Sequence, residues 1–117
     1  MKKYIAATAF EIGQVAYHAA RAAGDSRLLS RVQAILTLEK CLQEAGTAKD
    51  RIKWLSGIGT HLSMLERETP QTELEKVYRS DMLLAYESGT PSDEAMQILR
   101  GLREQIAQNR ATQLTMF

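Results

Sequence analysis

Helix-boundary signals divide this chain into short segments, and they constrain its fold more than any other feature. Only two prolines occur, in the pairs Thr69-Pro70 and Thr90-Pro91. A threonine can accept a free N–H at the start of a helix, and proline at the next position loses no helical hydrogen bond. Steps at Gly24 and Gly46 indicate the end of one helix and the cap of the next. Together these signals predict five helices, over residues 4–23, 26–45, 48–68, 70–88 and 91–109.

Each predicted helix carries apolar residues at helical spacing, and no stretch shows sustained strand-like alternation. Gly57 and Gly59 lower the helix propensity in the middle of the third segment, which predicts either a break or a crossing point with a neighbour. The expected apolar faces comprise Ile5, Ala9, Ile12, Ala16 and Ala19; Leu28, Val32, Ile35, Leu36 and Leu42; Ile52, Leu55, Ile58, Leu62 and Leu65; Leu74, Val77, Met82, Leu84 and Ala85; and Ala95, Ile98, Leu99, Leu102 and Ile106.

Short linkers between the segments imply antiparallel neighbours. We therefore expect an all-α protein, a compact bundle of about five antiparallel helices over residues 1–109 with a C-terminal tail or docking peptide over 110–117. Its 117 residues suit one domain. Five amphipathic segments also leave open a homo-oligomer that buries a surplus apolar face.

Net charge, cysteine content and the N-terminal sequence indicate the compartment and the classes of partner to expect. The formal net charge of +1 provides no strong field toward nucleic acid or an acidic membrane. Cys41 is the only cysteine, so it has no intramolecular disulfide partner, and its leucine neighbours predict a buried thiol. The apolar run after Lys3 is interrupted by Glu11, which argues against a signal peptide or a membrane span. We expect a cytoplasmic protein without membrane contact.

No constellation of catalytic or metal-binding residues is visible. His18 and His61 are the only histidines, and neither has a cysteine or carboxylate one helical turn further on. Cys41 lacks a neighbouring base, and neither a nucleophile elbow nor a phosphate loop occurs. We expect a non-enzymatic protein with no cofactor and no metal.

Basic residues provide one candidate interaction surface. Lys49, Arg51 and Lys53 cluster near Trp54, and another pair lies one helical turn apart in the second segment. Such side chains could contact phosphates, although a solvated helix face is the simpler explanation. The possible nucleic-acid contacts are Arg27, Arg31, Lys49, Arg51 and Lys53.

The last five residues, Gln113-Leu114-Thr115-Met116-Phe117, place two large apolar anchors near a free end. They resemble the pentapeptide by which bacterial proteins bind the sliding clamp, the ring that encircles DNA for the replicative polymerase. The resemblance implies that Gln113 anchors the peptide by hydrogen bonds and that Leu114 enters one apolar pocket. Met116 and Phe117 would fill the adjoining pocket, with Thr115 facing outward. The chain departs from the commoner pattern by Thr for Ser or Asp and by Met for Leu.

Three functions remain open. The resemblance implies an adaptor or regulator that docks on the clamp through Gln113, Leu114, Met116 and Phe117 and modulates DNA replication or repair. The small size and lack of chemistry fit a phage- or plasmid-encoded modulator. Alternatively, the last helix continues unbroken, the tail packs as part of the fold, and the bundle itself is a protein–protein interaction module or inhibitor. The third reading is a small nucleic-acid-binding domain.

Overall fold

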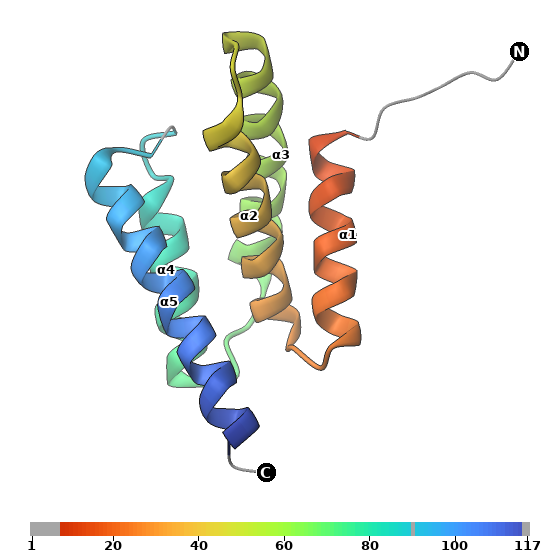
Figure 1. Cartoon of the computed structure of the whole chain (residues 1–117), viewed down its shortest axis with the longest axis vertical. Helices are drawn as coiled ribbons and strands as arrows, with labels where there is room; N and C mark the ends of the chain where they lie inside the picture. Colours follow the sequence, from red (N-terminus) through yellow and green to blue (C-terminus); the bar gives the residue numbers. More distant parts are fainter. Residues whose placement is uncertain (1–7, 90, 116–117) are drawn as a thin grey trace, which may run out of the picture.

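The computed structural model of the chain describes residues 8–89 and 91–115, with side chains as far as residue 109. Within these ranges the protein consists of helices and has no strand, which confirms the all-α prediction. Consecutive helices run antiparallel, and α2 lies in the middle, with α1 on one side and α4 and α5 on the other (Figure 1). The helices are α1 (Ala9–Ala22), α2 (Arg27–Glu44), α3 (Ala48–Arg67), α4 (Glu73–Ala85) and α5 (Asp93–Thr115).

Hydroxyl groups cap the start of every helix, but two of the caps differ from the prediction. The side chain of Thr72, rather than Thr69, accepts the N–H of Glu75, so α4 begins three residues later than expected. Before α5, Ser92 accepts the N–H of Ala95 at 3.2 Å, whereas Thr90 lies outside the described residues. The caps of the first three helices are Thr8, Ser26 and Thr47. A polar residue nearer the helix therefore replaces the Thr-Pro signal at both prolines.

The main hydrophobic core is built by α2, α3, α4 and α5. Its largest fully buried side chains include Leu28, Ile35, Leu38, Ile58, Leu65, Met82 and Leu99. The predicted faces of α2 and α5 are confirmed at Leu28, Val32, Ile35, Leu36, Leu42, Ala95, Leu99, Leu102 and Ile106.

Three predicted apolar faces are partly wrong. In α1, Ala19 is exposed, and Ile5 lies outside the described residues. In α4, Met82 and Ala85 are buried as predicted, but Leu74, Val77 and Leu84 are exposed, and Tyr78 is buried in addition. Tyrosine can be buried when its ring packs in the core, so a face counted from aliphatic residues alone left out Tyr78. In α3, Ile52 is 68% exposed because the first turns of the helix extend past the core.

Small residues bring α1 very close to α3. A Cβ added to Gly57 would lie 2.6 Å from the Cβ of Ala9, and one added to Gly13 would lie 2.3 Å from Nε2 of His61. Helix α3 passes through Gly57 and Gly59 without interruption, so the predicted crossing point is confirmed and the predicted break is wrong. Gly24, with φ of 101°, turns the chain from α1 into α2.

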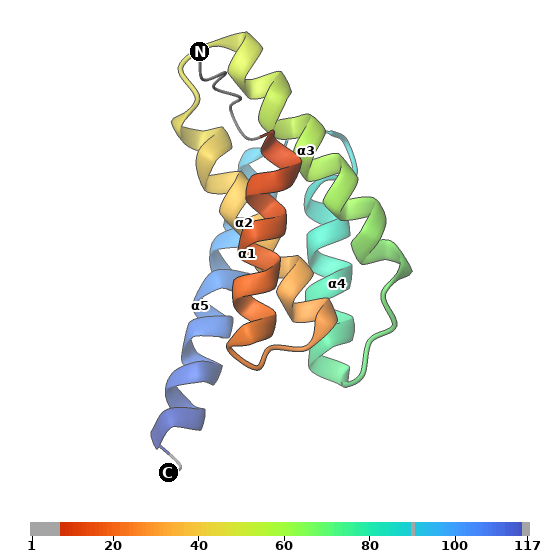
Figure 2. The same ribbon diagram turned by 90° about the vertical axis from the view of Figure 1, so that its right-hand side faces the viewer.

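Helix α5 is longer than predicted. It continues to Thr115, beyond the expected end at 109, and no proline or glycine interrupts this stretch. Its C-terminal end extends past the neighbouring helices in both views (Figures 1 and 2). Residues 110–115 thus continue the helix in their backbone, while Met116 and Phe117 lie outside the described residues.

Candidate functional site

The candidate docking peptide begins in the last turn of α5. Leu99, Leu102 and Ile106 bury one face of this helix in the core. Further along, Asn109 Nδ2 donates to the Tyr78 hydroxyl at 2.8 Å, which ties α5 to α4. Gln113 and Leu114 follow within the helical backbone, although their side chains, like all of Met116 and Phe117, lie outside the described part of the chain. The motif therefore begins four residues after Asn109, the last anchor of α5 among the described side chains.

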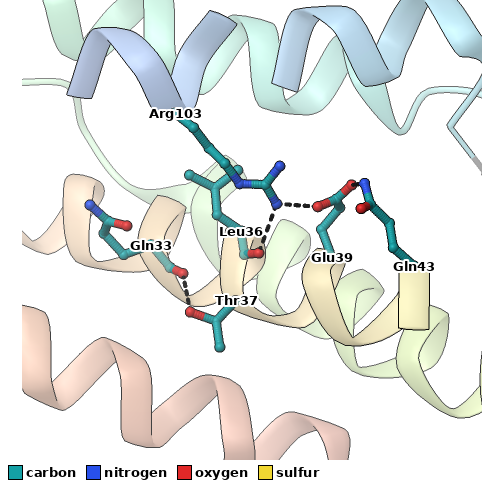
Figure 3. A network of polar contacts seen from close by, with 6 residues as sticks. All are labelled: Gln33, Leu36, Thr37, Glu39, Gln43 and Arg103. Atoms are coloured by element: carbon teal, nitrogen blue, oxygen red, sulfur yellow. Dashed lines mark hydrogen bonds and ion pairs between the residues drawn. The ribbon is translucent and has the colours of Figure 1, made fainter. Parts of the chain in front are cut away.

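A buried ion pair provides a second anchor for α5. Arg103 pairs with the carboxylate of Glu39 on α2 and donates to the Leu36 carbonyl at 3.1 Å (Figure 3). Gln43 donates to the other carboxylate oxygen of Glu39, whose side chain is only 1% exposed. A charge this deeply buried is tolerated only with a partner and further hydrogen bonds, and both are present. The network aligns α5 along α2.

Tyr86 lies close to this network and has unusual surroundings. Burial raises the pKa of Tyr86, and the negative charge of Glu39 raises it further. The Tyr86 hydroxyl and Nε of Arg103 are buried, and neither has a hydrogen-bond partner among the described residues. The phenol therefore stays neutral and contributes mainly through its ring.

A groove of about 330 Å³ lies beside the ion pair, between α2 and α5. On its α2 side, the Thr37 hydroxyl donates to the Gln33 carbonyl at 2.9 Å, as Figure 3 also shows. Its volume is at the lower limit for small-molecule sites, and its mixed lining has no nucleophile paired with a base. The lining residues are Gln33, Leu36, Thr37, Lys40, Arg103, Ile106 and Ala107.

A second buried polar network joins α1 to α2 and α3. Arg31 Nη1 lies 2.9 Å from Nδ1 of His61 and also donates to the side-chain oxygen of Gln14. The Arg31 guanidinium stacks over the Tyr17 ring at 3.9 Å. His61 Nε2 lies 3.0 Å from the Phe10 carbonyl oxygen. The rings of His61 and Phe10 also stack, with their centroids 4.9 Å apart. Residues distant in the sequence thus form one cluster beneath α1.

The chemistry of the partners determines the protonation of His61. A guanidinium only donates, so Nδ1 must accept from Arg31, and Nε2 must carry the hydrogen that is donated to Phe10. Burial lowers the pKa of His61; the Phe10 carbonyl opposes this shift, and the positive charge of Arg31 adds to it. His61 is therefore held as the neutral Nε2–H tautomer.

The structure does not bring the five basic candidate residues together. Arg31 is only 7% exposed and is occupied within the bundle, so it is not available to a phosphate. Arg27 is exposed and pairs with Glu68 at 3.1 Å. The remaining three, Lys49, Arg51 and Lys53, are exposed on the first turns of α3, where the Lys53 ammonium lies 4.8 Å from the Trp54 ring.

The structure also locates the cysteine and the second histidine that the sequence singled out. Cys41 is partly rather than fully buried, and this burial raises the pKa of its thiol. His18 is exposed on α1 and meets Tyr17 edge-on at 5.3 Å. No group of three or more potential metal ligands occurs within residues 8–89 and 91–109. Among the helices that the structure describes, none is both long enough and apolar enough to cross a membrane.

Sequence reasoning missed the two buried networks, although a signal for them was present. Arg31 lies between Leu28 and Ile35 on the apolar face of α2, and Arg103 lies between Leu99 and Ile106 on that of α5. A charged residue at a core position of a helix needs a buried partner. The sequence pattern therefore predicts that a partner exists but does not identify it.

Comparison with known proteins adds no relative. No protein-family model matches the chain, and no match is found among curated proteins or solved structures. The class that the structure defines is therefore an all-α bundle of five helices within the described residues.

Proposed function

We propose that this protein is a non-enzymatic helical adaptor or regulator that docks on the bacterial DNA polymerase sliding clamp. Its C-terminal peptide makes the contact, with Gln113 as the polar anchor and Leu114, Met116 and Phe117 as the apolar anchors. The resemblance of these residues to the clamp-binding pentapeptide is the observation that carries the proposal.

The position of the peptide supports this function. It begins on the end of α5 that extends past the neighbouring helices (Figures 1 and 2). The body holds α5 through the Arg103–Glu39 ion pair and the Asn109–Tyr78 hydrogen bond, both located before residue 110. A rigid body with an apolar peptide at its projecting end can present a few anchors to pockets, and a few buried anchors supply most of an interface's affinity.

Surface plasmon resonance on immobilised, purified sliding clamp tests the proposal. The full chain should bind, and Leu114→Ala/Phe117→Ala should weaken binding at least about tenfold, because two pocket-filling side chains are lost. Thr115→Ser serves as the matched control, since an outward-facing residue should tolerate it. Equal binding by the wild type and a chain ending at residue 112 would remove the hypothesis.

A second candidate is a protein–protein interaction module in which the bundle surface makes the contact. Val77 and Leu84 favour it, because both are exposed on α4 at a spacing of two helical turns. Removing residues 113–117 would then leave partner binding unchanged. If the tail packs against the body, the same truncation would lower the melting temperature, which circular dichroism measures.

The nucleic-acid alternative has a smaller surface than the sequence indicated, because Arg31 is buried. Lys49, Arg51 and Lys53 remain as its candidate phosphate contacts. Fluorescence anisotropy with duplex DNA at low ionic strength separates this function from the other two, since phosphate contacts weaken steeply with salt.

A further inference from the structure

Helix α1 stands apart from the hydrophobic core. Every residue of the buried core cluster belongs to α2, α3, the α4 region or α5, while the partly buried Ile12 of α1 packs against the cluster. The buried residues of α1 are Ala9, Gly13 and Ala20, which carry little side-chain surface. Release of α1 therefore exposes no large, fully buried apolar side chain of its own, which limits the free-energy cost of release.

Polar contacts supply much of what holds α1 in place. The Phe10 carbonyl accepts from His61, the Gln14 side chain accepts from Arg31, and the Tyr17 ring covers the same guanidinium. All three partners on α1 thus depend on two side chains, one on α3 and one on α2. Beyond the network, a four-residue turn at Gly24 connects α1 to α2.

We propose that α1 is a releasable cover on the α2–α3 face, and that protonation of His61 releases it while α2 to α5 stay folded. Nδ1 accepts from Arg31 only when it carries no proton. A proton on this nitrogen turns the hydrogen bond into a contact between two positive groups inside the protein. Release of α1 lets water reach both cations, which screens their repulsion and lowers the cost of burying them.

The charges around His61 leave this repulsion uncompensated. From α1 it is met by the uncharged Phe10 carbonyl and ring, and from α2 by Arg31. Among the described residues, Arg31 is the only charged group that shifts the pKa of His61. Burial lowers the pKa of Arg31; Tyr17 and the negative charge of Glu68 oppose this shift, and the positive charge of Arg27 adds to it. No carboxylate of the described residues acts on the pKa of His61 strongly enough to stabilise an imidazolium.

The direction of the pH effect follows from linkage. His61 has a lowered pKa in the closed state and recovers an ordinary value near 6.5 once water reaches it. The open state therefore binds the proton more readily, and opening increases as pH falls below about 6.5, by up to about tenfold per pH unit. Above about pH 7.5 both states are neutral at this site, and pH has no effect through it.

Native-state hydrogen exchange of the full chain at pH 7.5 and pH 5.5, corrected for intrinsic exchange rates, tests the proposal. Amides of α1 should exchange through an opening that leaves α2–α5 protected, and that opening should increase several-fold at pH 5.5. Equal protection of α1 and the core at both pH values would overturn the proposal.

Two matched variants assign the effect. His61→Gln keeps a donor for Phe10 and an acceptor for Arg31 but does not titrate, so its α1 opening should be independent of pH. His18→Gln removes the exposed histidine of α1 and should respond to pH as the wild type does. A wild-type pH response in His61→Gln, or its loss in His18→Gln, would refute the role of His61. Gln14→Leu adds a further check: it should increase opening at both pH values.

Discussion

An ion pair joins Arg103 of α5 to Glu39 of α2 across 64 positions of sequence, and the carboxylate is almost completely buried. Because Arg103 also donates to the Leu36 carbonyl, one guanidinium connects α5 to both the backbone and a side chain of α2. This contact helps to fix the helix that carries the proposed docking peptide.

Removing one partner of this pair should be costly. Arg103→Ala leaves the buried Glu39 carboxylate without its charged partner, and we expect the free energy of unfolding to fall by about 3 kcal/mol. Urea denaturation followed by circular dichroism measures it. The exposed pair Lys76–Glu73 provides the control, since Lys76→Ala should cost less than about 1 kcal/mol. Similar losses in the two variants would contradict the structural importance of the buried pair.

Two glycines of α3 should respond in opposite directions to alanine. Gly59 has nothing within 4 Å of an added Cβ, so Gly59→Ala should stabilise the protein by up to about 1 kcal/mol through helix propensity. At Gly57 the added Cβ meets Ala9, including its backbone, so Gly57→Ala should destabilise it by about 1–3 kcal/mol. Thermal unfolding of both variants gives the comparison, and a stabilising Gly57→Ala would mean that α1 does not approach α3 this closely.

Tyr78 and Tyr86, both buried, should also differ in their response to phenylalanine. Tyr86→Phe removes a buried hydroxyl that has no partner among the described residues, so stability should stay unchanged or rise by about 1 kcal/mol. Tyr78→Phe removes the acceptor of Asn109 and should cost about 1 kcal/mol. Chemical denaturation of both variants distinguishes them. A loss in Tyr86→Phe as large as that in Tyr78→Phe would show that its hydroxyl is satisfied after all.

The start of α4 can be tested by two threonines. Thr72→Ala removes the acceptor of the Glu75 N–H and should lower the free energy of unfolding by about 1 kcal/mol. Thr69→Ala lies before the helix and should leave it nearly unchanged. Urea midpoints of the two variants are the measurement. The reverse order of effects would restore the Thr-Pro cap that the sequence predicted.

The local pattern predicted much of the fold but misplaced details that depend on neighbours. Glycine and hydroxyl signals located the α1–α2 and α2–α3 turns to within a residue or two, because capping is a local interaction. At α4 and α5, several polar residues near each proline can cap, and local reasoning could not choose among them. The same limit explains why the aliphatic residues Val77 and Leu84 were placed inside while Tyr78 was not.

The candidate docking peptide was found from sequence alone, since a short linear motif needs no tertiary contact to be visible. The partners of Arg31, His61, Glu39 and Arg103 could not be found in this way. Each of these residues is a charged or titratable side chain on an apolar face, which predicts that a partner exists. The identity of that partner depends on how the helices pack, since His61 lies 30 positions from Arg31 and Arg103 lies 64 positions from Glu39.

Sequence by itself determined that the chain forms five amphipathic helices in the described region, because helix starts, stops and periodicity arise from neighbours within a few residues. Only the tertiary structure decided that α2 to α5 make the hydrophobic core, and that α1 is held over it by glycine contacts and a buried histidine–arginine network. The physical reason is the distance along the sequence over which each interaction acts. Helix formation is local, whereas burial and charge pairing depend on which distant helix packs alongside.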